Sequence, residues 1–138
     1  MNGREKTIAL ITRYYDAFNK GDVEGMLACV ADNIAHDVNQ GERRNGKKMF
    51  AEFCAHMSEC YAEKLTHIVI MASDDGKNAS AEFVVNGTYK KGETGLPTAN
   101  GQTYVLPAGA FLEVTGDKIS RVTTYYNLQD WIKQVEAA

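Results

Sequence analysis

The spacing of apolar residues changes once along the chain. In the first part, apolar residues recur every three or four positions, which is typical of helices that bury one face. This spacing predicts helices over Thr7–Lys20, Val23–Val30 and Lys47–Tyr61. Gly21 is placed to end the first helix, and Asp22 to cap the second.

From Glu63 onward the period falls to two, as expected for strands. The turn Asp74–Lys77 is a hairpin signal between two such runs. A separate short strand is predicted over Asn33–Asn39, between the second and third helices, and a short helix ends the chain. The later strands are expected from Glu63 and over 79–90, 102–115 and 119–128.

Helices followed by a meander of strands indicate the α+β class, with the N-terminal helices packed in the concave face of a curved, mostly antiparallel sheet. A chain of 138 residues has room for one hydrophobic core, so we expect a single domain over residues 1–138. The open end of such a cone is an apolar pocket with few polar groups.

Asp37 is a carboxylate inside a short, mostly apolar strand. A buried charge is costly unless it has a partner or a function, so we place Asp37 at the floor of the pocket. Burial there would raise its pKa and make it a usable base. The alternative is a structural carboxylate in a salt bridge. Tyr14 is either a hydroxyl donor aimed at the same pocket or a core tyrosine bonded to backbone or water.

Three motifs carry a family resemblance. They are Tyr14-x-x-Ala17-Phe18-Asn19-x-Gly21-Asp22 in the first helix, Asp37 followed by Arg44-Asn45-Gly46, and Tyr125-Tyr126-Asn127-Leu128 at the end of the last strand. Together they resemble the nuclear transport factor 2-like (NTF2-like) superfamily, in particular its SnoaL-like and ketosteroid-isomerase-related branch, over about Thr7 to Val135. The resemblance implies the cone fold.

Ketosteroid isomerase uses an Asp to move a proton beside a ketone, while a Tyr and a protonated Asp stabilise the enolate. The resemblance implies the proton-moving role for Asp37 and the oxyanion-donating role for Tyr14. Gly109, counted back from Phe111, occupies the position expected to hold the second acid. We therefore expect proton transfer on an apolar, carbonyl-bearing ligand, as in an isomerase or a cyclase- or dehydratase-like lyase, rather than steroid isomerisation itself.

The alternative is a non-catalytic ligand-binding or dimerisation module of the same fold, which pairing of Asp37 with Arg43 or Arg44 would favour. Strand alternation places His36 on the face opposite Asp37, at the surface or an interface. Alternation with Phe83 points Glu82 away from the core, whereas the resemblance places Glu82 in the cavity. The further residues expected to contact the ligand are Asn39, Glu82, Val84, Tyr126, Phe53 and Phe111.

Composition excludes several classes of partner. The net charge is −3 and basic clusters do not exceed two residues, so nucleic-acid binding is not expected. Nucleotide-binding glycine motifs are absent from the sequence, and we expect no cofactor. Three cysteines without paired spacing indicate free thiols in a reducing compartment. His56 and His67 fall on unrelated elements without a second ligand one turn away, so no metal site is expected.

The sequence shows neither a signal-peptide pattern nor an apolar run of about 20 residues, so we expect a cytoplasmic protein that does not bind membranes. We also expect a homodimer formed through the sheet. Its outer face carries Tyr89, Tyr104 or Tyr125, which a second copy would cover.

Overall fold

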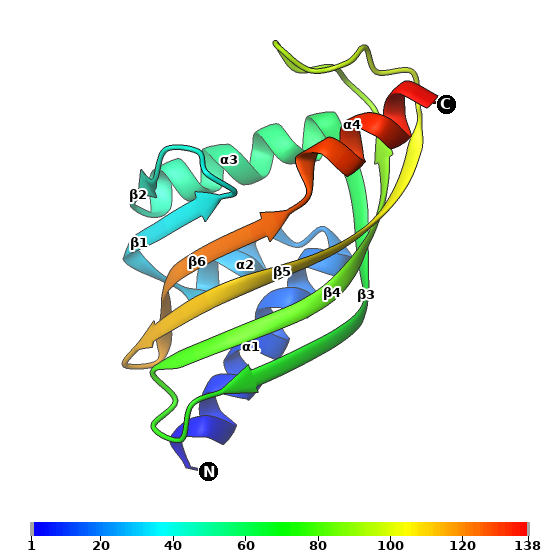
Figure 1. Ribbon diagram of the computed structural model, residues 1–138. Coiled ribbons are helices and arrows are strands. Elements are labelled where there is room, and N and C mark those ends of the chain that lie inside the picture. Colours follow the sequence, from blue (N-terminus) through cyan, green and yellow to red (C-terminus); the bar gives the residue numbers. More distant parts are fainter. Residues whose placement is uncertain (1, 138) are drawn as a thin grey trace.

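The computed structural model of the protein describes residues 2–137, and Figure 1 shows helices lying against a curved sheet. In chain order its elements are α1 (Gly3–Lys20), α2 (Val23–Cys29), β1 (Val30–Val38), β2 (Arg44–Asn45), α3 (Lys47–Cys60), β3 (Tyr61–Ala72), β4 (Asn78–Tyr89), β5 (Thr103–Thr115), β6 (Lys118–Tyr126) and α4 (Leu128–Ala137). None of these helices is both long and apolar enough to cross a bilayer.

The six strands form one open sheet in the order β2-β1-β6-β5-β4-β3. β1 runs parallel to β6, and all other neighbours are antiparallel. Figure 1 shows β3, β4 and β5 bending together, with α1 and α2 behind them and α3 beside β1. The expected α+β cone fold is confirmed, and each predicted element forms with ends that differ by a few residues.

The sequence motif in α1 has a structural explanation. Asn19 binds the backbone of Leu65 in β3 twice, accepting from its N–H at 2.8 Å and donating to its carbonyl at 3.0 Å. Gly21 ends the helix in the left-handed region at φ +68°, where a side chain would be strained. Asp22 then caps α2 by accepting from the Gly25 N–H at 2.9 Å. These residues therefore set the position of α1 against the sheet.

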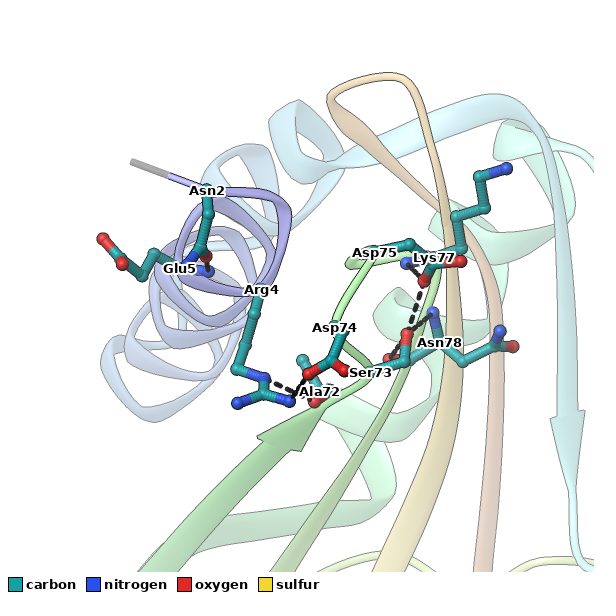
Figure 2. A network of polar contacts seen from close by, with 9 residues as sticks. All are labelled: Asn2, Arg4, Glu5, Ala72, Ser73, Asp74, Asp75, Lys77 and Asn78. Carbon is teal, nitrogen blue, oxygen red and sulfur yellow. Dashed lines mark hydrogen bonds and ion pairs between the residues drawn. The ribbon is translucent and has the colours of Figure 1, made fainter.

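The N-terminal end of α1 is joined to the β3–β4 turn (Figure 2). Arg4 pairs with Asp74 and donates to the Ala72 carbonyl at 3.1 Å. The backbones of Gly3 and Gly76 approach so closely that a Cβ on Gly76 would lie 2.2 Å from the Gly3 oxygen. Gly76 also has φ +74°. Both features require glycine at this turn.

The core lies between the helices and the concave face of the sheet. The inward face of α1 buries Leu10, Ile11, Tyr14 and Tyr15, and the facing strands bury a set that includes Ile34, Phe83, Tyr89, Leu106, Leu112 and Val122. α4 packs Trp131 into the same core, where it contacts the rings of Tyr61, Tyr89 and Tyr104. The helices and the concave face of the sheet thus enclose an internal space.

Candidate active site

A cavity of about 150 Å³ lies between the concave face of the sheet and the helices. Its lining is mostly apolar and aromatic, with contributions from α1, α3 and every long strand. The titratable side chains that line it are Tyr14, Tyr15, His36, Cys54, Tyr61, Glu63 and Tyr126. An enclosed apolar space with a few polar groups is the usual form of a small-molecule site.

His36, not Asp37, faces this cavity. Ile34, His36 and Val38 alternate on the inner face of β1, and His36 is only 4% exposed. Asp37 therefore points to the outer face of the sheet, because neighbouring side chains of a strand alternate. The prediction that Asp37 forms the floor of the pocket was therefore wrong, as was the prediction that His36 lies at a surface or interface.

Asp37 is held by three hydrogen bonds on that outer face. Arg43 donates to both carboxylate oxygens, from Nε at 2.8 Å and from Nη2 at 2.9 Å, and the Thr123 hydroxyl donates at 2.6 Å. The bonds from Arg43 dominate and lower the pKa of Asp37 to about 2. A carboxylate so strongly stabilised in its charged form is a poor proton acceptor near neutral pH.

His36 lies between two aromatic rings of α3, with centroid distances of 5.1 Å to Phe50 and 4.6 Å to Phe53. Its Nδ1 is buried without a hydrogen-bond partner among residues 2–137. Burial, and secondarily the charge of Arg44, lower its pKa to about 4, so the ring is neutral at pH 7. A buried, unpaired polar atom in a cavity wall is costly, and a ligand could satisfy it.

Among residues 2–137, Glu63 is the one side-chain carboxylate that lines the cavity. Burial raises its pKa, while the Tyr104 hydroxyl, which donates to Oε2 at 2.5 Å, acts in the opposite direction. Glu63, Gly87 and Tyr104 are register partners on β3, β4 and β5. The Tyr104 ring crosses β4 over Gly87, where an added Cβ would lie 2.2 Å from the ring. The missing side chain at Gly87 thus lets Tyr104 reach Glu63.

Two of the residues predicted from the sequence do line the cavity, Tyr14 and Tyr126. Tyr14 is 4% exposed, and burial raises its pKa well above the ordinary value, so its hydroxyl stays protonated. Tyr126 lines the same space. Phe53 contacts the His36 ring and lies beneath the Arg44 guanidinium, 4.5 Å from ring centroid to Cζ. Asn39 instead accepts a hydrogen bond from the Tyr126 N–H at 2.8 Å and so joins the ends of β1 and β6.

The remaining predicted ligand contacts lie on the other side of the sheet. Glu82, Val84 and Phe111 line an open groove on the outer face, and Phe111 is 53% exposed. Gly109 lines the same groove and pairs with Glu82 in the β4–β5 register. The cavity face of β4 is formed by Phe83 and Val85, as simple alternation indicated, so the face inferred from the resemblance was wrong.

The cavity adjoins a depression on the surface between the ends of α1 and α3 and the start of β3. The two spaces share Phe18, Met26, Cys54, Met57, Tyr61 and Glu63. Glu63 therefore lies at the boundary between the cavity and the surface depression.

Sequence reasoning missed His36 and Glu63, although both left a signal. In β1 the residues in phase with His36 are the apolar Ile34 and Val38, and Glu63 is in phase with the buried Leu65. The reason given for expecting no metal site was also wrong, since Cys60 follows His56 by one helical turn. The structure brings Glu93 to this pair, so that three side chains of types that bind metals lie together.

Comparisons with known proteins agree with the fold. A family model described as SnoaL-like domain matches residues 11–122. A protein from Silicibacter sp. TM1040, provisionally called a polyketide cyclase, is 55% identical with a TM-score of 0.93, over 96% of both chains. A protein from Xanthomonas campestris pv. campestris with the same provisional description is 51% identical with a TM-score of 0.94, over 97% of this chain and 99% of that one.

A more distant structure, an LEH-like epoxide hydrolase from M. tuberculosis, shares the fold at 14% identity and a TM-score of 0.76, over 99% of this chain and 89% of that one. A search of curated proteins finds no match.

Proposed function

The chain belongs to the SnoaL-like domain family, and on that premise we propose that its cavity catalyses cofactor-free proton transfer on a small, apolar carbonyl compound. Glu63 is the group that takes and returns the proton, in place of Asp37. The observation that carries the proposal is a carboxylate with a raised pKa in the wall of an apolar cavity. Perturbed acids of this kind concentrate at catalytic sites.

The reaction moves one proton and one electron pair. Glu63 removes a proton from the carbon next to the carbonyl, and the electrons of that C–H bond pass to the carbonyl oxygen. The Tyr14 hydroxyl, which stays protonated, donates a hydrogen bond to this oxygen. Neutral His36 is the alternative donor, in the tautomer that carries its hydrogen on the unpaired Nδ1. Return of the proton to another carbon gives isomerisation. Alternatively, the enolate carbon attacks a second carbonyl, whose π electrons pass to its oxygen, and this alkoxide takes the proton back from Glu63 as the ring closes.

The volume of the cavity limits the substrate. At about 150 Å³ it matches an apolar cavity of roughly 150 Å³ that holds one benzene molecule. A single ring or a short chain fits, whereas the four fused rings of a steroid do not. A longer substrate would extend into the depression that shares Glu63 with the cavity. The provisional description of two relatives as polyketide cyclases favours ring closure over isomerisation.

Hydrogen–deuterium exchange tests the chemistry without knowledge of the natural substrate. The protein is incubated with cyclohexanone in D₂O, and loss of the protons next to the carbonyl is followed by NMR. We expect exchange above the buffer rate, and a decrease by a factor of about 10²–10⁴ in Glu63→Gln. Glu52→Gln, which makes the same change at an exposed site on α3, is the matched control.

A second candidate is a binding module without catalysis, which the pairing of Asp37 with Arg43 favours because it occupies the carboxylate that the family motif suggests as base. In that case cyclohexanone would bind and stabilise the protein against unfolding, yet the protons next to its carbonyl would exchange at the buffer rate. That result would reject proton transfer.

We further propose that two copies associate through the outer face of the sheet. Of the tyrosines expected on this face, Tyr89 and Tyr104 are instead buried in the core, whereas Tyr125 is exposed. Tyr125, Met71 and Phe111 are each about half exposed there and line one open groove. An apolar surface of this kind is commonly covered by a partner, and a second copy of the chain provides the same surface.

A further inference from the structure

A cluster of side chains with nitrogen, sulfur and oxygen donors lies outside the cavity, where the end of α3 meets the loop between β4 and β5. His56 and Cys60 are one turn apart on α3, and Glu93 comes from the loop. The His56 Nε2, the Cys60 Sγ and a Glu93 carboxylate oxygen all lie within 4.8 Å of one another. Cys60 is buried, Glu93 partly buried and His56 exposed.

The geometry differs from that of a cysteine nucleophile with a relay to an acid. In such a relay the thiol and the carboxylate contact opposite nitrogens of the imidazole. Here Sγ lies 3.8 Å from Nε2, and the Glu93 Oε1 approaches the same Nε2. Burial and the nearby Glu93 charge also raise the pKa of Cys60, which leaves it protonated and unreactive. Instead, three donor atoms from different side chains lie within 4.8 Å of one another, as the ligands of a metal ion do.

We propose that His56, Cys60 and Glu93 bind one Zn²⁺ ion, with water as the fourth ligand. Zinc accepts sulfur, imidazole nitrogen and carboxylate oxygen at about 2.0–2.3 Å in tetrahedral sites. Two ligands of one zinc ion therefore lie within roughly 4.6 Å of each other, and the 3.8 Å between Sγ and Nε2 satisfies this limit.

The charges also balance. A thiolate and a carboxylate neutralise a divalent ion, and the imidazole binds in its neutral form. Formation of the thiolate releases one proton to solvent when the metal binds. The nearby lysines are directed elsewhere, since Lys90 donates to the Ser58 carbonyl at 2.7 Å and Lys91 pairs with Glu59 at 3.7 Å.

Neighbouring residues orient the proposed ligands. The Tyr61 hydroxyl donates to the second oxygen of Glu93, so the first oxygen, which faces the His56 Nε2, is the one that would bind the metal. Groups that hold a ligand in this way often change metal affinity by about 10–100-fold. Tyr61 also lines the cavity, as does Leu96 from the loop that carries Glu93. The ion would therefore fasten part of the cavity wall to α3, whatever reaction the cavity performs.

Cobalt is a suitable probe, because a Co²⁺–thiolate bond gives a charge-transfer band in the near ultraviolet. Protein freed of metal with a chelator is titrated with Co²⁺ under reducing, anaerobic conditions. We expect one equivalent to bind, with the thiolate band and visible bands typical of four ligands, and Zn²⁺ to displace it. Absence of the band in the wild type would reject the site.

Variants identify the ligands. Cys60→Ser should remove the band, and Glu93→Gln and Tyr61→Phe should weaken binding by about tenfold or more. Cys54→Ser and Glu59→Gln are the matched controls and should bind as the wild type does. If Cys60→Ser does not fold, the comparison of Glu93→Gln with Glu59→Gln decides. Equal affinity in these two, or loss of the band in Cys54→Ser, would overturn the proposal. No substrate is involved, so the result is independent of the role of Glu63.

Discussion

Arg43 holds both carboxylate oxygens of Asp37, with N–O distances of 2.8 and 2.9 Å. This paired geometry fixes the orientation of the carboxylate as well as its charge. Asp37 thus has a structural role on the outer face of β1, and the proposed proton transfer takes place on the opposite face of the sheet.

Asp37→Asn should therefore affect stability rather than proton transfer. We expect the free energy of unfolding to fall by about 1–3 kcal/mol at pH 7, because charged hydrogen bonds are lost. The folded-state pKa of about 2 lies below the ordinary Asp pKa of 3.8, so the stabilisation is complete above about pH 4 and is lost as the pH falls toward 2. Urea unfolding at pH 7 and pH 3 measures this. Unchanged stability with loss of deuterium exchange would restore Asp37 as the base.

His36→Phe should flatten the dependence of stability on pH. Between pH 4 and 6.5 the unfolded chain binds a proton at His36 that the folded chain does not, so wild-type stability rises with pH over this range. The variant lacks this contribution, on the order of 2–3 kcal/mol. The free energies of unfolding of both proteins at pH 4.5 and pH 7 give the difference, and parallel curves would contradict burial of a neutral ring.

Tyr104→Phe should raise the pKa of Glu63. Burial raises the pKa of Glu63, and the hydrogen bond from the Tyr104 hydroxyl to the charged carboxylate lowers it. Removal of this hydroxyl therefore lets burial raise the pKa further. An NMR titration of the Glu63 side chain detects the shift directly. The acid limb of the deuterium-exchange profile should move to higher pH in the same variant. A shift to lower pH would mean that Tyr104 stabilises the neutral acid.

Gly76→Ala should separate the β3–β4 turn from α1. The new methyl would meet the Gly3 backbone and must also adopt φ +74°, so we expect a loss of about 2 kcal/mol or more. Gly116→Ala is the matched control, because Gly116 has φ +63° but nothing within 4 Å of the added carbon. Its loss should be about 1 kcal/mol. Equal losses in denaturant unfolding would show that the close approach is unimportant.

The proposed dimer predicts a mass of twice the 15.2 kDa chain by light scattering at micromolar concentration. Phe111→Glu places a charge in the exposed apolar groove and should shift the protein to monomer. Met49→Glu changes an equally exposed apolar residue on α3 and should leave the mass unchanged. A wild-type mass of one chain would reject the dimer.

The fold was accessible from the sequence because each element carries a local signal. Periodicity located the helices and long strands, and Gly21, Asp22 and Gly76 marked their ends. The motif in α1 was informative for a physical reason as well, since Asn19 binds β3 and so specifies how the first helix meets the sheet.

The candidate site was harder to predict, because charge is a weak guide to the face of a strand. Asp37 drew attention as a charge among apolar residues, yet it is in phase with Asn33 and Asn39, whereas His36 is in phase with Ile34 and Val38. Contacts between residues far apart in the sequence could not be predicted from local patterns. Nothing in the spacing brings Glu93 to His56, or Tyr104 across β4 to Glu63.

Gly87 has a consequence beyond packing. It bears no functional group, yet it is the register partner of both Glu63 and Tyr104, and its missing side chain leaves the gap through which they meet. The pKa of Glu63 therefore depends partly on the missing side chain at Gly87 in the adjacent strand, because that gap lets the Tyr104 hydroxyl reach the carboxylate. Any larger residue at position 87 would retune the proton affinity of the cavity while every group that touches the substrate stayed the same.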